Sequence, residues 1–110
     1  MELNAQTQDD VMLVTANASR IDASVAIQFK DQMRDLTDGG PTRIVLDMAQ
    51  VDFIDSSGLG AVVAAMKLVG SERKLELANL TPTVAKVFKL TRMDGIFIIH
   101  DDLDAFKLAS

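Results

Sequence analysis

Residues 44–60 of the chain read IVLDMAQVDFIDSSGLG and join a strand pattern to a helix pattern. The apolar run from Arg43 to Met48 is typical of a central strand in a parallel sheet. After Asp55-Ser56-Ser57, apolar residues recur at helical spacing, which predicts a helix that ends near Gly70. The members of this stripe are Leu59, Val62, Val63, Met66 and Val69. A buried strand that leads into a helix of this kind indicates an α/β protein.

The segment before this stretch contains two strand patterns and one helix pattern. Residues 2–7 and 11–16 predict a hairpin whose second strand is buried on both faces, followed by a polar connector over 17–20. A helix then starts near Asp22, where Asp22 or Ser24 can accept hydrogen bonds from the free N–H groups of the first turn, and it ends at Gly39-Gly40-Pro41. The inner stripe of this helix consists of Val25, Phe29, Met33 and Leu36.

The segment after this stretch continues the alternation. We expect a strand around residues 75–80 and a helix that begins at Thr81-Pro82, because proline suits the first helical position. Gly95 ends that helix, residues 96–99 predict a final buried strand, and residues 101–108 predict a short last helix.

No linker, low-complexity stretch or internal repeat interrupts this order, so we expect residues 1–110 to form a single domain. Alternating strands and helices predict a mixed, mostly parallel sheet of about five strands with about four helices. The hairpin adds one antiparallel strand, which we expect at an edge of the sheet.

The composition excludes several classes of function. The 110 residues include 11 Lys and Arg against 16 Asp and Glu, for a net charge of −5, with no Cys, Trp or Tyr and a single His. The acidic charge and the few aromatic residues disfavour nucleic-acid binding by base stacking. The lack of Cys and the single His disfavour thiolate metal sites, multi-histidine metal sites and a hydrolytic triad, so we expect no enzyme. No apolar run approaches the length of a membrane span and no leader pattern opens the chain, which predicts a cytoplasmic protein without membrane insertion.

The side-chain hydroxyls of Ser56 and Ser57 are the groups in this sequence that most suggest a chemical role. They lie where a helix begins, and the free N–H groups and positive dipole end of a helix stabilise a phosphate dianion. Gly58 and Gly60 would let another protein's active site approach closely. The competing interpretation is that a serine only caps the helix and that the glycines only permit tight packing. The residues alone leave both interpretations open.

Other polar side chains have simpler explanations. Asp47, Asp52 and Asp55 surround one strand end, but without a second group of ligands they are best interpreted as solvated loop charges. His100 follows a predicted strand and is interpreted as a strand-end or capping residue. The spacing of Gly58 and Gly60 fits neither a dinucleotide fingerprint nor a P-loop. The sequence therefore predicts no metal site and no bound cofactor.

With residues 44–48 and the string Asp55-Ser56-Ser57-Gly58-Leu59-Gly60, the chain resembles the STAS domain, and more closely the bacterial anti-sigma factor antagonists. The resemblance covers essentially the whole chain. It implies a partner switch in which the unmodified protein binds an anti-sigma factor that is also a serine kinase, and thereby frees a sigma factor. Phosphorylation then abolishes binding, and a metal-dependent PP2C-type Ser/Thr phosphatase resets the switch.

The resemblance also assigns roles to residues. It maps the phosphoacceptor to Ser56, and the phospho-loop and partner contacts to Asp55, Ser57, Gly58, Leu59 and Gly60. Asp22 and Asp52 become candidates for the partner surface. Many family members carry a Gly-Glu-Leu/Ile-Asp run after the second strand, whereas residues 16–22 here read ANASRID and keep only the Ile-Asp end.

Two alternatives remain. The chain could be a STAS subunit of a transport or sensor complex that is never phosphorylated, or a partner switch whose output is not a sigma factor.

Overall fold

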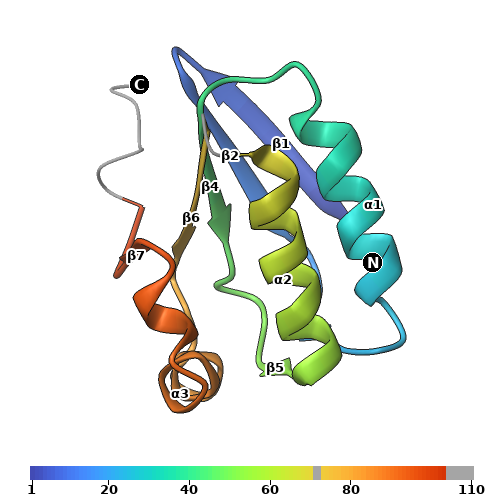
Figure 1. Cartoon of the computed structure of the whole chain (residues 1–110), viewed down its shortest axis with the longest axis vertical. Helices are drawn as coiled ribbons and strands as arrows, with labels where there is room; N and C mark the ends of the chain where they lie inside the picture. Colours follow the sequence, from blue (N-terminus) through green and yellow to red (C-terminus); the bar gives the residue numbers. More distant parts are fainter. Residues whose placement is uncertain (71–72, 104–110) are drawn as a thin grey trace.

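A computed structural model describes residues 1–70 and 73–103 of the chain. Its main sheet has five strands, which lie in the order β1-β2-β4-β6-β7 (Figure 1). Their bounds are β1 Leu3–Gln8, β2 Val11–Ala16, β4 Arg43–Asp47, β6 Lys74–Ala78 and β7 Ile99–His100. Only β1 runs antiparallel, at the edge beside β2. The predicted mixed, mostly parallel sheet of five strands is confirmed.

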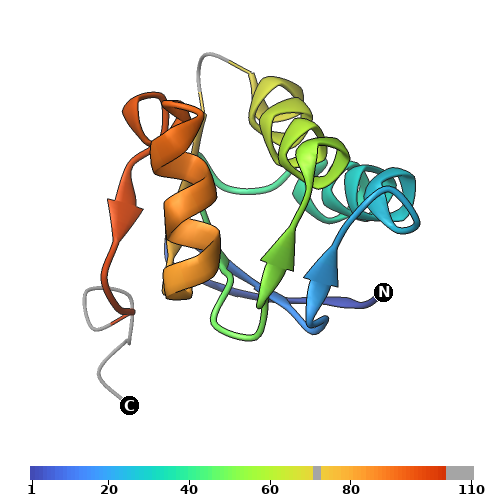
Figure 2. The same ribbon diagram turned by 90° about the horizontal axis from the view of Figure 1, so that it is seen from below.

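Two of the helices cover one face of this sheet. Helix α1 (Ala26–Thr37) and helix α2 (Ser56–Val69) lie side by side there, whereas α3 (Pro82–Leu90) is set apart beside the small strand β5 (Phe53–Ile54), as Figure 2 shows. A 3-10 turn, Met93–Gly95, follows α3. None of the described helices combines the length and the apolarity that crossing a lipid bilayer requires.

The core fills the space between α1, α2 and the sheet. Helix α1 contributes Phe29 and Met33 to the core. Both belong to the predicted stripe and are at most 1% exposed. Strand β4 contributes Ile44 and Leu46, which are fully buried. Burying side chains of this size stabilises a fold by roughly 1.5–3 kcal/mol each, so this layer holds α1 against the sheet.

A second, two-stranded sheet was not predicted. Strand β3 (Arg20–Ile21) pairs in parallel with β5, within the region interpreted as a polar connector and a loop. Strands of two residues are too short to show a period of two, which explains why no sequence pattern indicated them. This small sheet lies directly before α2 and holds its first turn in place.

The structure corrects several predicted boundaries. Helix α1 begins at Ala26 rather than near Asp22, because Asp22 caps a preceding turn instead. Helix α3 ends at Leu90, before the turn and the 3-10 segment that contain Gly95. Strand β2 alternates between half-buried and buried residues, so it is fully buried on one face only.

The end of the chain also differs from the prediction. The last described strand is β7, and the predicted buried strand over 96–99 is wrong because Ile96 and Ile98 are about half exposed. The described residues contain three α-helices and one 3-10 turn. Residues 101–103 are not helical, and the rest of the predicted fourth helix over 101–108 lies outside the described residues.

Candidate functional site

Helix α2 is capped by Asp55 and not by either serine. The Asp55 Oδ1 atom accepts a hydrogen bond from the Gly58 backbone N–H at 2.8 Å, and the Asp55 carbonyl accepts from Leu59 N–H at 2.8 Å. An aspartate in this position satisfies one of the otherwise free N–H groups of a helix start. The interpretation of Ser56 or Ser57 as the cap is therefore wrong, and both hydroxyls are left for other chemistry.

Ser56 and Ser57 are the first two residues of α2 and both are exposed. Neither hydroxyl makes a hydrogen bond with any described residue. Their backbone N–H groups lie at the positive end of the helix dipole and have no carbonyl partner within the helix. A phosphate on either oxygen would meet favourable dipoles and no steric barrier from the described part of the chain.

The loop before α1 is tied to this helix start. The second oxygen of Asp55 accepts a hydrogen bond from Ala23 N–H at 3.2 Å. Asp22, one residue earlier, accepts from the Ser24 hydroxyl at 2.6 Å and from Arg20 Nε at 3.2 Å. Hydrogen bonds from Ser24, and next from Arg20, hold the pKa of Asp22 below its ordinary value. Asp22 therefore stays ionised close to the start of α2, and its part in a partner surface stays a prediction.

The structure reassigns Gly58 and Leu59. A Cβ on Gly58 would lie 1.8 Å from the carbonyl oxygen of Ile21, so this glycine permits β3 to pack against α2. Leu59 is only 8% exposed and belongs to the core. Both residues therefore serve packing in the folded domain, and the expectation that they contact a partner stays a prediction. Gly60 is exposed and a Cβ there would meet nothing within 4 Å, so its side of the helix is open.

An exposed carboxylate and an exposed aromatic ring lie just before Asp55 in the chain. Asp52 is exposed, and its backbone N–H donates to Ser19 at 2.8 Å. Phe53 is 38% exposed, and the Arg20 guanidinium lies 4.3 Å from its ring centroid. Stacking of a cation on an aromatic face stabilises both side chains. These residues add an apolar and charged rim to the surface around the start of α2.

Sequence reasoning missed the hollow between α1 and α2 beside Ser57. It has a volume of about 180 Å³, and its lining includes Ile27, Lys30, Ser57, Gly60 and Ala64. Ile27 is 70% exposed, which is unusual for an isoleucine in a helix. The sequence feature that could have indicated this hollow is Ile27, an apolar residue outside the inner stripe of α1. The hollow provides an apolar contact next to the two hydroxyls.

A buried carboxylate on the other face of the sheet was also missed. Glu76 on β6 is 2% exposed, and it accepts hydrogen bonds from Arg43 Nη2 at 2.9 Å and pairs with His100 Nε2 at 2.7 Å. The hydrogen bonds from Arg43, and next that from His100, outweigh burial and lower the pKa of Glu76. His100 is thus a pairing residue near a strand end. Among the described residues, no three metal-ligating side chains gather in one place.

Comparisons with known proteins agree with this fold. A model of the STAS domain family matches residues 2–106. BtrV, a candidate anti-sigma factor antagonist of Bordetella bronchiseptica, is 30% identical over 101 residues, which are 91% of this chain and 87% of BtrV. The crystal structure of a candidate antagonist from Thermotoga maritima has a TM-score of 0.80 at 27% identity, over 94% of this chain and 89% of that chain.

The anti-sigma factor antagonist SpoIIAA of Bacillus has the same fold. Its unphosphorylated form gives a TM-score of 0.73 and its phosphorylated form 0.67, each at 20% identity over 94% of this chain and over 92% and 96% of those chains. The family model spans nearly the whole sequence, and BtrV aligns with most of it. This chain therefore belongs to the STAS-domain family of anti-sigma factor antagonists.

Proposed function

We propose that this chain is an anti-sigma factor antagonist whose binding is controlled by phosphorylation of Ser56. The unphosphorylated form binds an anti-sigma factor with serine kinase activity and frees a sigma factor in the cytoplasm. A PP2C-type phosphatase removes the phosphate. The chain itself acts as a binding protein and kinase substrate rather than as an enzyme. The single observation that carries this proposal is the exposed Ser56 hydroxyl at the start of α2, free because Asp55 caps the helix.

The surroundings of Ser56 suit a switch by local charge. A phosphate adds about −1.5 to −2 charges. It would join Asp22, Asp52 and Asp55 on a surface whose apolar contacts are Ile27 and Phe53. A partner shaped for a neutral hydroxyl would then have to bury an unpaired dianion, which costs on the order of 3–5 kcal/mol. This cost weakens binding by at least about a hundredfold.

The phosphate need not change the fold of the free protein. The N–H groups of Ser56 and Ser57 and the dipole of α2 stabilise added negative charge where it would be attached. SpoIIAA has this fold in both of its forms, which supports a local effect here as well. We therefore infer that affinity changes through charge and desolvation at the interface.

The departure from the family pattern lies on the same surface. Residues 16–22 lead through β3 into the turn that hydrogen-bonds to Asp55. A changed loop at this position would alter which anti-sigma factor fits, while the acceptor at Ser56 and its helix start stay the same. We infer that this loop sets the identity of the partner.

Paired serine variants test the proposal. We would incubate the wild-type protein, Ser56→Ala and Ser57→Ala with the purified anti-sigma factor kinase of the same organism and ATP, and locate phosphate by mass spectrometry. We expect Ser57→Ala to be labelled and Ser56→Ala to bind without being labelled. Ser56→Glu is expected to bind at least about tenfold more weakly than Ser56→Ala. Full labelling of Ser56→Ala would refute the assignment of the acceptor.

Affinity capture with and without ATP tests the partner. We expect the anti-sigma factor to be retained without ATP and released with it, and release to fail with Ser56→Ala. Retention of a transport or sensor protein that is indifferent to ATP would instead support the alternative of a STAS subunit without phosphorylation.

A further inference from the structure

Among residues 1–70 and 73–103, the first half of strand β6 has no strand partner on its β7 side, and we call this stretch its open edge. The strand pairs with β7 only at Leu77 and Ala78. The N–H groups of Leu77 and Asn79 donate across this edge to Ile98 and His100, at 2.9 and 3.1 Å. Because alternate peptide groups of a strand point to the same side, the N–H of Leu75 points to this edge too. Within the described part of the chain it meets no carbonyl of β7 or of the segment before it.

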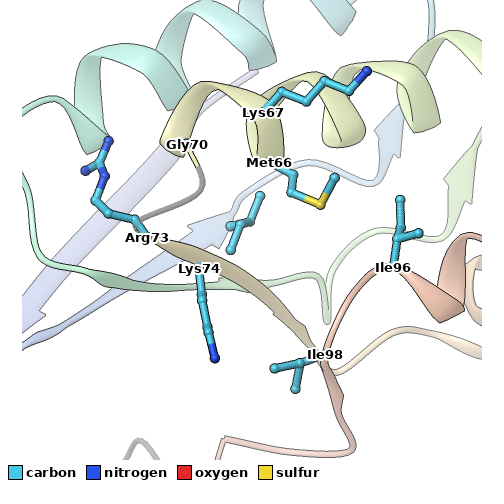
Figure 3. Close-up of a pocket in the computed structure, with 8 residues that line it drawn as sticks. Met66, Lys67, Gly70, Arg73, Lys74, Ile96 and Ile98 are labelled. Carbon is cyan, nitrogen blue, oxygen red and sulfur yellow. The ribbon is translucent and has the colours of Figure 1, made fainter.

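Two hollows flank this open edge, one on each face of the sheet. The larger, about 560 Å³, lies on the side of α2 and is lined by Met66, Leu75, Ile96 and Ile98 among others (Figure 3). The smaller, about 330 Å³, lies on the opposite face and is also lined by the Arg43–Glu76 ion pair, and the two hollows share Lys74 and Ile98. Their volumes are in the range of sites that take ligand groups.

The surface around the edge is apolar and positively charged. Ile96 and Ile98 are 49% and 50% exposed. Lys67, Arg73 and Lys74 line the larger hollow, and none of the three forms an ion pair with a described residue. Arg73 is held in place by its hydrogen bonds to backbone carbonyls. This concentration of cations occurs on a chain whose net charge is −5.

We propose that the edge of β6 at residues 74–76 takes an extended segment of a partner protein as an added parallel or antiparallel strand. Successive side chains of such a strand point to opposite faces of the sheet. One set enters the apolar hollow beside Met66 and Ile96, whose lining also carries Lys67 and Arg73. The other set lies over the opposite face near Lys74, where the Glu76 carboxylate is already paired with Arg43 and His100. The segment that fits is one in which apolar residues alternate with Asp or Glu.

This surface is separate from the phosphorylation site. Ser56 begins α2 and Gly70 follows its end, so the 14-residue helix separates the two by roughly 20 Å. Binding at the β6 edge is therefore independent of a phosphate on Ser56. The inference goes beyond the proposed function and does not rest on it.

Synthetic peptides test the inference directly. The probes are two fluorescein-labelled sets of about eight residues, the length of one strand, with Val, Ile or Leu at alternate positions. Asp or Glu fills the remaining positions of the first set, and Lys or Arg those of the second. Fluorescence anisotropy with the full chain should detect binding of acidic peptides and none of basic ones. Equal binding of both sets, or of neither, would overturn the proposal.

Variants of the chain localise the binding. Lys74→Glu and Ile98→Asp change exposed side chains. Each should weaken the binding of the tightest acidic peptide at least about tenfold. Lys86→Glu, on the exposed side of α3 and outside both hollows, makes the same charge change and should leave affinity as it is. Circular dichroism melting confirms that the variants stay folded. A loss as large in Lys86→Glu would assign the effect to net charge and overturn the site.

Backbone chemistry separates an added strand from a merely sticky groove. N-methylation of the peptide at alternate residues removes one edge of donors, and one of the two methylation registers should abolish binding. Amide chemical shifts should move at residues 73–77 and 96–99 and stay unchanged at Ser56 and Ser57. Binding indifferent to both registers, shifts elsewhere, or self-association that Ile98→Asp abolishes would each overturn the proposal.

Discussion

Gly58 lies beneath the candidate site, where α2 packs against the backbone of β3. Replacing it by alanine tests how closely α2 and β3 must approach. The added Cβ would lie 1.8 Å from the Ile21 carbonyl oxygen, 2.6 Å from its carbonyl carbon and 3.0 Å from Cγ1 of Ile54. Since non-bonded carbon atoms prefer about 3.5–4.0 Å, the helix and the strand must separate by more than about 1 Å. The nearest atoms belong to backbone, so no side-chain rotation relieves the contact.

The expected loss of stability is the difference between two effects. Overpacking against rigid neighbours costs about 3 kcal/mol at the upper end of its usual range. Replacing glycine inside a helix by alanine contributes about 0.5–1 kcal/mol in the other direction. Gly58→Ala should therefore lower the free energy of unfolding by about 2 kcal/mol. For a domain of this size this corresponds to a melting temperature roughly 8 °C lower.

Gly60→Ala is the matched control because it makes the same chemical change two residues along the same helix. A Cβ there has nothing within 4 Å, so only the gain in helix propensity remains. It should raise the melting temperature by about 2–4 °C. Urea denaturation followed by circular dichroism measures both variants. Equal shifts for the two variants, or a Gly58→Ala protein as stable as wild type, would refute the argument from close approach.

Three further outcomes follow from the contacts described above. Hydrogen bonds from Arg43 hold the pKa of Glu76 below its ordinary value of 4.5, so its stabilisation is present above that pH and is lost as pH falls through the lower, folded-state pKa. Glu76→Gln should therefore unfold at lower urea than wild type at about pH 7, and the difference should shrink towards about pH 3. Leu59→Ala should cost about 2–4 kcal/mol in urea denaturation because Leu59 is buried; unchanged stability with lost partner binding would make it a surface contact instead. Ile27→Asp should weaken capture of the anti-sigma factor at least about tenfold without lowering the melting temperature, whereas Leu90→Asp, equally exposed on α3, should change neither.

The location of the candidate site could be predicted from local sequence because its parts are neighbours in the chain. The string from Asp55 to Gly60 contains the cap, both hydroxyls and the open glycine within the first two helical turns. The sequence reasoning considered only a serine as the cap of α2, although aspartate caps helices about equally well. The hydrogen bond from Gly58 to Asp55 identifies Asp55 as the cap and leaves Ser56 free.

Contacts between distant segments could not be predicted in the same way. Arg43, Glu76 and His100 come from three different strands, and their grouping depends on strand order and register. The alternation of strands and helices indicates that the sheet is parallel but does not specify which residues face each other. Ile96 and Ile98 were predicted to be buried because apolar residues usually are, yet β7 begins too late to cover the edge of β6.

The sequence by itself determined the α/β class, the stripe of Phe29 and Met33 that faces the core, and the position of Ser56 at a helix start. These features depend on backbone periodicity and on capping within a few residues, which short-range patterns encode. The tertiary structure alone decided that Gly58 serves packing, that Leu59 is buried and that no described strand pairs with β6 at residues 74–76 on its β7 side. Each of these depends on which distant segment lies opposite, and that is fixed only when the whole chain packs around one core.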